Sequence, residues 1–453
     1  MKKSGKRILL IAMLLSGFMG KTLLFAQDAV QKQVQPVINT GHTAWMIVAS
    51  VLVLFMTIPG LAFFYGGLVR QKNILNILMQ CFVATAAVTL QWIILGYSLS
   101  FSSSHGFLAP YIGGLDWAFL KGIGINDVSP FFVSQPVERI PHLLFVLYQC
   151  MFAVITPALI IGAFAERIKF SGFLVFTILW STFVYNPVAH WLWCPDGWLY
   201  KMGAVDFAGG AVVHINAGIA ALVTALMIGK RKNYHHVTIP PHNIPFVVLG
   251  AAMLWIGWFG FNAGSGLAAD GLAVNAFLVT HVAASVAAVA WVILDWIFNK
   301  KPTLVGIVTA SVAGLAAITP AAGFVDVFGA IIIGLVVSII CFFMVGHVKP
   351  LFGYDDTLDA FGVHGIAGLW GTIAVGIFAT PVIQNYTGLL HGSGVLLGKQ
   401  LLASVVTTVY SGVLTFVLFW VVDKFFGIRV SPKEEAMGLD FTMHKEVAYT
   451  NID

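Results

Sequence analysis

The segment Val213-His214-Ile215-Asn216-Ala217-Gly218 recurs later in the chain as Val363-His364-Gly365-Ile366-Ala367-Gly368. Both copies read V-H-x-x-A-G, and each lies in an apolar segment long enough to cross a bilayer. These are the fifth and the tenth such segments, so the two copies run in opposite directions through a membrane. The pattern predicts an inverted repeat of five plus five helices with one extra helix, although four identical residues within six positions are weak support alone in a chain rich in Gly and Ala. Inverted repeats place a transport site near the membrane midplane.

The composition around this repeat is that of a membrane protein. Of 453 residues, 59% are hydrophobic and 9% are charged, whereas soluble domains carry about 25% charged residues. Eleven apolar segments of about 17–28 residues recur, a length that suits a hydrocarbon core of about 30 Å. We therefore expect an all-α integral membrane fold with eleven transmembrane helices, at residues 43–69, 74–101, 141–165, 172–193, 206–228, 245–265, 273–297, 303–319, 325–346, 360–380 and 400–422.

The distribution of basic residues predicts the orientation. Of the 24 Lys and Arg residues, 14 fall in the loops and tail that an N-out/C-in arrangement places in the cytoplasm, five fall in the outer loops, and five lie within residues 1–26. Because cytoplasmic loops are enriched in Lys and Arg, this bias favours N-out/C-in. The net charge of +5 thus reflects membrane topology, and we expect no nucleic-acid partner.

The two ends of the chain have compositions of their own. Residues 1–26 combine a basic start with a short apolar stretch that ends at Lys21, which predicts a cleaved signal peptide; an uncleaved membrane helix is the alternative. Residues 27–425 form the predicted transmembrane domain, and residues 426–453 form a polar cytoplasmic tail. The four cysteines show no spacing typical of a disulfide framework or a zinc site.

Two histidines are the most informative residues within the spans. His214 lies eight residues after Asp206, and His364 lies five residues after Asp359, so each is roughly 7–12 Å inside its end of the helix at the helical rise. Ionisable side chains inside the membrane usually mark function. The alternative is that each is a neutral residue hydrogen-bonded to a neighbouring helix. No third ligand stands at helical spacing, so no metal site is expected.

Several long motifs resemble the ammonium transporter (Amt/Mep/Rh) family, and the resemblance runs from about residue 40 to Tyr449. The motifs are Asp206 to Gly218, Gly257-Trp258-Phe259-Gly260-Phe261-Asn262-Ala263-Gly264-Ser265, Gly162 to Arg167, and Asp359 to Gly365. The chain looks most similar to the bacterial Amt branch, because it carries both Trp193 and Ser265.

The resemblance implies roles for individual positions. Trp193, Phe152 and Ser265 would form an outer recruitment site, and Phe152 with Phe261 would gate the pore. The other implied positions are His214 and His364 as twin pore histidines, Trp258 as a pore-lining residue, and Asp206 as the acidic residue below the recruitment site. For Asp206 we expect helix capping and a long-range negative field, not direct binding. Tyr148 departs from the pattern, since related bacterial proteins often carry Phe there.

The chemistry of these residue types suits ammonium. Aromatic faces attract a cation by about 0.5–2 kcal/mol each, whereas a charge at the bilayer centre costs from about 2.5 to above 10 kcal/mol. An apolar pore therefore selects neutral ammonia once a proton is removed, and histidine changes its charge most easily near neutral pH. We expect electrogenic ammonium uptake, with methylammonium as an analogue and no cofactor.

The resemblance also predicts binding partners, and it leaves alternative functions open. The resemblance implies a homotrimer in the bacterial inner membrane, and a tail that a PII-type regulatory protein could bind. The alternatives are a passive ammonia channel, which shares every motif, and an ammonium sensor, which the short segment after the last span disfavours. We do not expect an enzymatic function, because no nucleophile, metal set or cofactor motif accompanies the histidines.

Overall fold

The computed structural model describes residues 35–232, 234 and 239–449. Helix dominates this part of the chain, and its strands are a single parallel pair, β1 (Val37–Ile38) and β2 (Glu138–Arg139). The predicted signal peptide, residues 1–26, lies outside the described residues.

The first half of the chain folds into helices that are broken by short π-helical and 3-10 turns, both written η. They are α2 (Thr40–Phe55), η1 (Met56–Leu61), α3 (Ala62–Leu68), η2 (Gln71–Asn73), α4 (Ile74–Gln91), η3 (Trp92–Gly96), α5 (Tyr97–Phe101), η4 (Ala118–Leu120), α6 (His142–Phe164), α7 (Phe170–Trp180), η5 (Ser181–Tyr185), α8 (Asn186–Trp193), α9 (Trp198–Met202), η6 (Gly210–Ile215) and α10 (Asn216–Ile228).

The second half of the chain also consists of helices broken by short π-helical and 3-10 turns. Its elements are α11 (Ile244–Gly264), α12 (Gly271–Leu294), η7 (Asp295–Asn299), α13 (Leu304–Ile318), α14 (Val327–Phe343), η8 (Met344–Val348), α15 (Lys349–Phe352), η9 (Phe361–Gly365), α16 (Ile366–Phe378), η10 (Leu389–His391), α17 (Val395–Phe426), α18 (Pro432–Met437) and α19 (Leu439–His444).

Within the described residues, ten helical stretches are long and apolar enough to cross a membrane, and α13 is a shorter apolar helix of 15 residues. Each predicted span coincides with one of these helices. The largest boundary difference is at the predicted span 172–193, because the helical stretch continues through α9 to Met202. The predicted span that starts at 206 begins instead at Gly210, after a loop that Asp206 closes.

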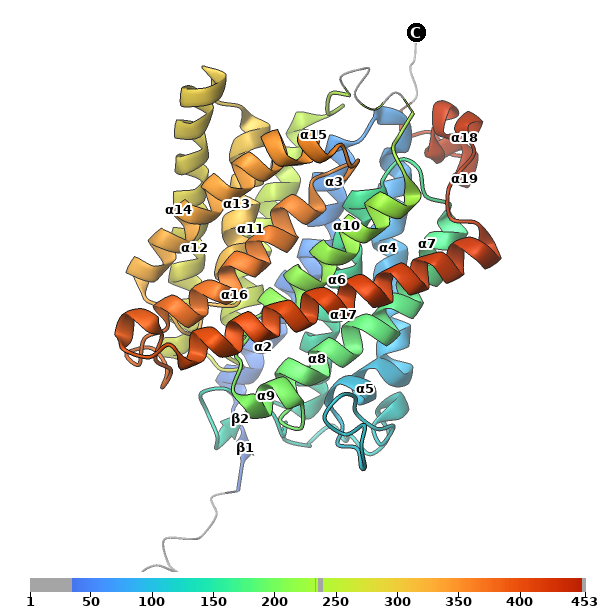
Figure 1. The fold of residues 1–453 in the computed structure, drawn as a ribbon. Coiled ribbons are helices and arrows are strands. Elements are labelled where there is room, and N and C mark those ends of the chain that lie inside the picture. Colours follow the sequence, from blue (N-terminus) through green and yellow to red (C-terminus); the bar gives the residue numbers. More distant parts are fainter. Residues whose placement is uncertain (1–34, 233, 235–238, 450–453) are drawn as a thin grey trace, which may run out of the picture.

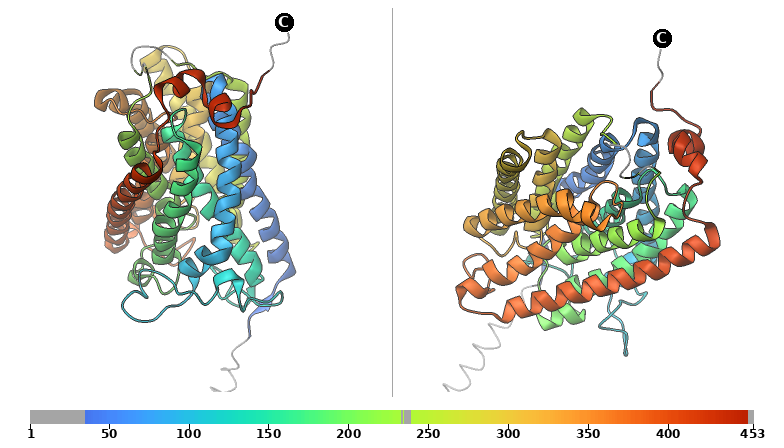
Figure 2. Two further views of the ribbon diagram at one scale, coloured as in Figure 1. Left: turned by 90° about the vertical axis from the view of Figure 1, so that its right-hand side faces the viewer. Right: turned by 45° about the horizontal axis from the view of Figure 1, so that its top comes forward.

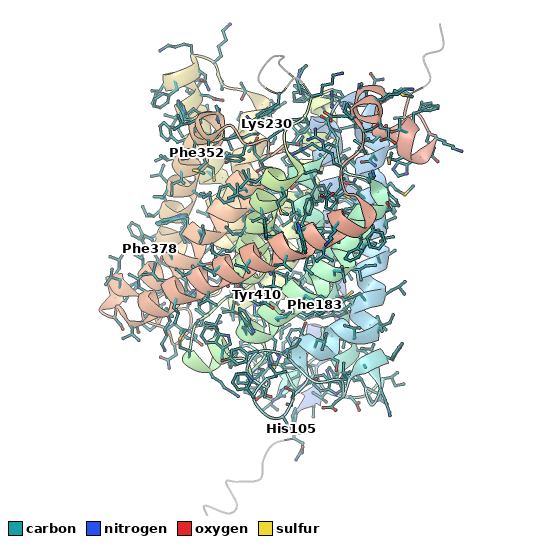
Figure 3. The ribbon with its side chains drawn as sticks, turned by 45° about the vertical axis from the view of Figure 1, so that its right-hand side comes forward. His105, Phe183, Lys230, Phe352, Phe378 and Tyr410 are labelled. Carbon is teal, nitrogen blue, oxygen red and sulfur yellow. The ribbon has the colours of Figure 1, made fainter. Side chains whose placement is uncertain are left out.

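The helices form one bundle with its loops gathered at two ends. β1 and β2 lie at one end, and α15, α18 and α19 lie at the opposite end (Figure 1 and Figure 2). The long helix α17 crosses one side of the bundle obliquely (Figure 1). Its Tyr410 hydroxyl donates a hydrogen bond to the backbone carbonyl of Phe183 (2.8 Å), and Figure 3 shows these two residues close together.

The two segments that carry V-H-x-x-A-G cross in the centre of this bundle. A Cβ placed on Gly218 would lie 2.2 Å from the Cα of Gly365, and one on Gly368 would lie 2.8 Å from the carbonyl oxygen of Gly210. Small residues permit such close approach between membrane helices. The pairing of 210 with 368 and of 218 with 365 shows that the segments run in opposed directions, and the contact brings their histidines into the same layer.

Candidate functional site

His214 and His364 meet at this crossing. Their ring centroids lie 5.3 Å apart, and the ring planes differ by only 9°. The two side chains are 1% and 3% exposed. Both ring nitrogens of His214, and Nδ1 of His364, have no hydrogen-bond partner among the described residues. These ring nitrogens therefore do not make the hydrogen bonds to neighbouring helices that were the alternative for the two histidines.

The histidines belong to π-helical segments, which sequence reasoning did not predict. His214 lies in η6 and His364 in η9. A π-helix widens the backbone turn and often occurs at functional sites. The same local geometry at both positions extends the internal similarity of the two motifs from sequence to backbone.

Trp258 and Phe261 of α11 flank the first histidine. The Trp258 ring stacks on His214 at 5.6 Å with an interplanar angle of 18°, and the Phe261 ring lies 6.2 Å from the same imidazole. The indole Nε1 of Trp258 donates a hydrogen bond to Thr319 Oγ1 (2.8 Å). Because this bond fixes the indole orientation, Trp258 forms a rigid wall beside the imidazole.

A narrow enclosed cavity runs along these rings. Apart from the two histidines its lining is apolar: Met56, Leu61, Phe64, Ile155, Leu159, Val213, Leu254, Trp258, Phe261 and Val312. The centre of a water-sized sphere can move through about 10 Å³ of it, which is close to the least space that holds one water molecule. The cavity therefore has room for about one water-sized molecule.

A wider cavity of about 350 Å³ opens on the side of β1, β2 and the 102–141 loop, with Phe152, Trp193, Asp206 and Ser265 among its lining residues. Phe152 and Phe261 lie between the two cavities with ring centroids 4.3 Å apart. Both phenyl rings are 1% exposed. Phe261 lines the narrow cavity and Phe152 lines the wide one, so the two phenyl rings, tilted by 38°, stand between the cavities.

Trp193 and Ser265 face the wide cavity beside Phe152. The Trp193 and Phe152 rings lie 5.6 Å apart at an angle of 87°, a T-shaped arrangement. The Ser265 hydroxyl donates to the carbonyl of Phe261 (2.9 Å). Since its only proton is engaged there, the oxygen lone pairs remain available as acceptors. Aromatic faces and an acceptor oxygen make an environment suited to a small cation.

Tyr148, the departure noted in the sequence, lies directly behind this site. Its hydroxyl lies 2.9 Å from the carbonyl oxygen of Gly260, 2.8 Å from that of Phe261, and 3.3 Å from Ser265 Oγ. A phenylalanine could make none of these contacts. In this chain, the tyrosine therefore ties α6 to the C-terminal end of α11, which carries Phe261 and is followed directly by Ser265.

Asp206 caps the segment that leads to His214. Its carboxylate accepts hydrogen bonds from the backbone N–H groups of Gly209, Gly210, Ala211 and Val212, at 2.6–3.0 Å. The side chain is 6% exposed. Four donors leave little capacity for a ligand, so the structure shows the expected capping contact. The long-range field of this carboxylate remains a prediction.

Sequence reasoning missed Asp356, the counterpart of Asp206. Its carboxylate accepts from the N–H groups of Ala360 (3.1 Å) and Phe361 (2.8 Å) and so caps η9. The sequence signal was present, because Asp356 precedes His364 by eight residues, as Asp206 precedes His214. Asp359, which the sequence suggested as the end of that span, pairs instead with Lys349 (2.6 Å).

The cysteines and the loop histidine His242 do not line either cavity. All four cysteines are free and buried. Among the described residues no group of three or more His, Cys, Asp or Glu side chains could hold a metal ion. His242 binds the backbone of Val69 and the Tyr449 hydroxyl, and His235 and His236 lie outside the described residues.

Comparisons with known proteins show the family to which the chain belongs. The model of the Ammonium Transporter Family matches residues 44–449. The chain is 48% identical to the ammonium transporter of Bacillus subtilis over 90% of this chain and 98% of that protein, and 48% identical to Ammonium transporter Amt1 of Archaeoglobus fulgidus over 91% and 100%.

Solved structures show the same relationship. Candida albicans Mep2 superimposes with a TM-score of 0.80 at 35% identity, covering 88% of each chain, and a structure described as a Sensor Amt Protein matches with a TM-score of 0.80 at 30% identity, covering 89% of this chain and 98% of that one. With the family pattern matched over nearly the whole transmembrane region and with bacterial and archaeal relatives at this identity, the chain belongs to the ammonium transporter family, whose members are membrane transporters and not enzymes.

Proposed function

We propose a specific route for ammonium through this transporter. Ammonium is recruited in the wide outer cavity by Trp193, Phe152 and Ser265. It loses its proton near the gate formed by Phe152 and Phe261, and the resulting ammonia crosses the narrow cavity beside the two histidines.

The observation that carries this proposal is the pair of unpartnered imidazoles in an otherwise apolar passage. A bare ammonium ion would lose its hydration there and gain no compensating ligand shell, at a cost of several kcal/mol on the order of that for membrane-buried charges. Neutral ammonia avoids this cost. It can also accept a hydrogen bond from an imidazole N–H and donate to an imidazole lone pair, so the histidines replace part of its solvation.

The fate of the proton separates net ammonium uptake from passive ammonia conduction. Each imidazole has one donor and one acceptor nitrogen when neutral. Parallel rings 5.3 Å apart can pass a proton through one bridging molecule, or directly once a small ring movement brings two nitrogens into hydrogen-bond contact. We infer that the pair passes the proton inward and that uptake is electrogenic. Potassium gains nothing from this relay because it has no proton to give up.

The wider setting follows from the family and the charge pattern. We infer eleven spans, with α13 as the short one, in an N-out/C-in inverted-repeat arrangement, a cleaved signal peptide, and a homotrimer in the bacterial inner membrane with one pore per subunit. The tail containing α18 and α19 would then be cytoplasmic, where a PII-type regulatory protein could dock.

A proteoliposome current measurement tests the route. Ammonium addition should produce an inward current that falls strongly when His214 and His364 are both replaced by Ala. The matched control is His281→Ala, because His281 is also a mid-helix histidine but lies on the exposed side of α12 against Trp255. Equal, current-free ammonia uptake by the wild type and the double variant would instead identify a passive channel, and binding without uptake would identify a sensor.

A further inference from the structure

The lining of the wide cavity contains two buried polar atoms for which the site described above gives no use. They are Oε1 of Gln149 and Nε2 of Gln384, and neither has a hydrogen-bond partner among the described residues. Buried polar atoms in folded proteins almost always have a partner, so each exception calls for an explanation. The explanation differs for the two atoms, because one is an acceptor and the other is a donor.

Helical spacing directs Gln149 toward the cavity. Phe145, Gln149 and Phe152 follow one another on α6 at intervals of four and three residues, so they form one stripe along the helix. All three line the wide cavity. Gln149 lies one turn before Phe152, roughly 4.5 Å along the helix axis, on the side away from the narrow cavity. A cation that moves from the outer loops toward Phe152 therefore passes Gln149 first.

The aromatic residues on either side of Gln149 are fixed by their own contacts. The Phe145 ring stacks on Phe131 of the 102–141 loop, with ring centroids 4.6 Å apart and an interplanar angle of 22°. Phe152 packs against Phe261. The half-buried amide of Gln149 is thus held on a rigid helix face between two anchored rings. A preorganised group of this kind loses little conformational freedom when it binds a ligand.

The other polar groups of the cavity wall are largely engaged within the protein. The Asp206 carboxylate already accepts four backbone N–H groups, and the Trp193 indole N–H donates to the carbonyl of Asp206. Ser265 keeps only its acceptor capacity, because its proton is donated to Phe261. An ammonium ion brings four N–H donors, so one hydroxyl oxygen satisfies it poorly. The carbonyl oxygen of an amide adds two lone pairs.

We propose that Gln149 is a further binding residue of the outer cavity, whose Oε1 accepts a hydrogen bond from the incoming ammonium ion. The inference rests on the proposed function, because it adds a second acceptor to the site where that function places recruitment. It also predicts a basis for specificity. Ammonium and methylammonium carry enough N–H groups to bond both Gln149 and Ser265, whereas a fully methylated ammonium ion has none and keeps only the attraction of the aromatic faces.

Gln384 does not suit a cation in the same way. It belongs to the loop after α16, and the buried end of its amide is the NH₂ group. A donor with a partial positive charge offers no bond to a cation. Gln384 therefore provides a matched control for Gln149, with the same side chain in the same cavity but the opposite group buried.

The first test replaces Gln149 by Leu, which removes the acceptor. We expect the apparent KM for the ammonium-evoked current in proteoliposomes to rise roughly tenfold, the effect of losing a hydrogen bond to a charged partner. The maximal current should change much less. Because Oε1 loses no partner within the protein, the unfolding temperature should not fall. In the control Gln384→Leu, the KM should remain that of the wild type.

Gln149→Glu separates binding from a structural role. The carboxylate keeps the shape of the side chain and strengthens the acceptor, so the KM should fall several-fold. The maximal current should also fall, because a nearby negative charge stabilises the protonated form of the bound amine. A residue that only shapes the cavity wall would raise the KM in both variants, and that result would contradict the inference.

A binding measurement distinguishes this inference from the proposed function. Calorimetric titration with ammonium chloride of a purified variant that carries His214→Ala and His364→Ala requires no proton relay. Adding Gln149→Leu to that variant should weaken binding by the same factor of roughly ten. Equal affinity with and without Gln149, or the same loss from Gln384→Leu, would overturn the inference. A wild-type protein without current would reject the proposed function alone, since the titration still decides the role of Gln149.

Discussion

Two residues of the wide cavity, Trp193 and Ser265, offer different groups to a cation. Trp193 offers an aromatic face with its indole N–H already bonded to the carbonyl of Asp206 (2.8 Å), and Ser265 offers an acceptor whose proton is engaged. In the proposed route these groups bind ammonium before the proton is lost. They should therefore affect the concentration dependence of transport more than its maximal rate.

Replacing Trp193 by Ala should raise the apparent KM for ammonium by roughly 2- to 30-fold, the range that corresponds to one cation–π contact of about 0.5–2 kcal/mol. The maximal current should change much less. Concentration series of ammonium-evoked current measure both values. Trp420→Ala on the exposed side of α17 is the matched control, and a Trp193 variant with normal KM and reduced maximal current would show that the indole serves the gate instead.

Some residues of the site could be predicted from the sequence, whereas others depend on how the helices pack. The two histidines, Trp258 and Phe261 stand in long motifs. The Tyr148 contacts could not be predicted, because they depend on where α6 meets the end of α11. The cap by Asp356 could have been predicted from the sequence, because Asp356 precedes His364 by the same eight residues that separate Asp206 from His214, whereas Asp359 does not.

At the scale of elements, the crossing of η6 with η9 and α16 sets the distance between the imidazoles. A Cβ on Gly368 would lie 2.8 Å from the His214 Cβ and 2.8 Å from the backbone nitrogen of Ile215. Neither atom belongs to the far end of a flexible side chain. The glycine is therefore required by the packing of the backbone that carries the first histidine.

Gly368→Val should push the two segments apart and separate the imidazoles. We expect loss of most ammonium-evoked current, together with a lower unfolding temperature of the purified protein. Gly398→Val is the control, since a Cβ at Gly398 of α17 meets no atom within 4 Å. Normal current in Gly368→Val would mean that the close contact between the histidines is not needed for transport.

The C-terminal tail, which contains α18 and α19, also packs a titratable histidine against the bundle. His444 Nε2 lies 2.9 Å from Asn76 Nδ2, and the Asn76 carbonyl oxygen is engaged by Gln80 Nε2 (2.9 Å), so the imidazole must accept a hydrogen bond here. Burial lowers the pKa of His444, against the opposing charges of Asp440 and Glu446. The docked tail thus binds protons less readily than the free tail.

Docking should accordingly be strongest above the ordinary histidine pKa of about 6.5 and weaken as pH falls through the lowered pKa of the docked state. A spin label at Glu446→Cys can report this, because the native cysteines are buried. Its mobility should increase on acidification from pH 7.5 to 5. His444→Gln, which still offers an acceptor but does not titrate, should abolish that increase, and an unchanged pH response in this variant would assign the effect to another group.

At the scale of the whole molecule, the apolar spans and the charge bias could be predicted because they are properties of composition along the chain. The π-helical segments and the buried charge cluster of Glu166, Arg167, Arg231 and Asp355 could not be predicted. The cluster depends on contacts between loops about 65–190 residues apart, such as Glu166 with Arg231 and Arg167 with Asp355. No local pattern of hydrophobic and polar residues records such pairings.

The orientation is open to a direct test. The N-out/C-in arrangement predicts that Lys121→Cys reacts with a membrane-impermeant maleimide in intact cells, whereas Lys301→Cys reacts only after permeabilisation. The four native cysteines are buried, so we expect the maleimide to label only the introduced cysteine. Labelling of Lys301→Cys in intact cells would reverse the orientation and with it the direction of the proposed route.

The central claim is that ammonia and its proton cross by separate means within one pore. Its most direct test is the ratio of transported charge to labelled methylammonium, measured on the same wild-type proteoliposomes. The account predicts one elementary charge for each molecule taken up, with no current when potassium replaces the amine. Uptake of methylammonium without accompanying charge would contradict it.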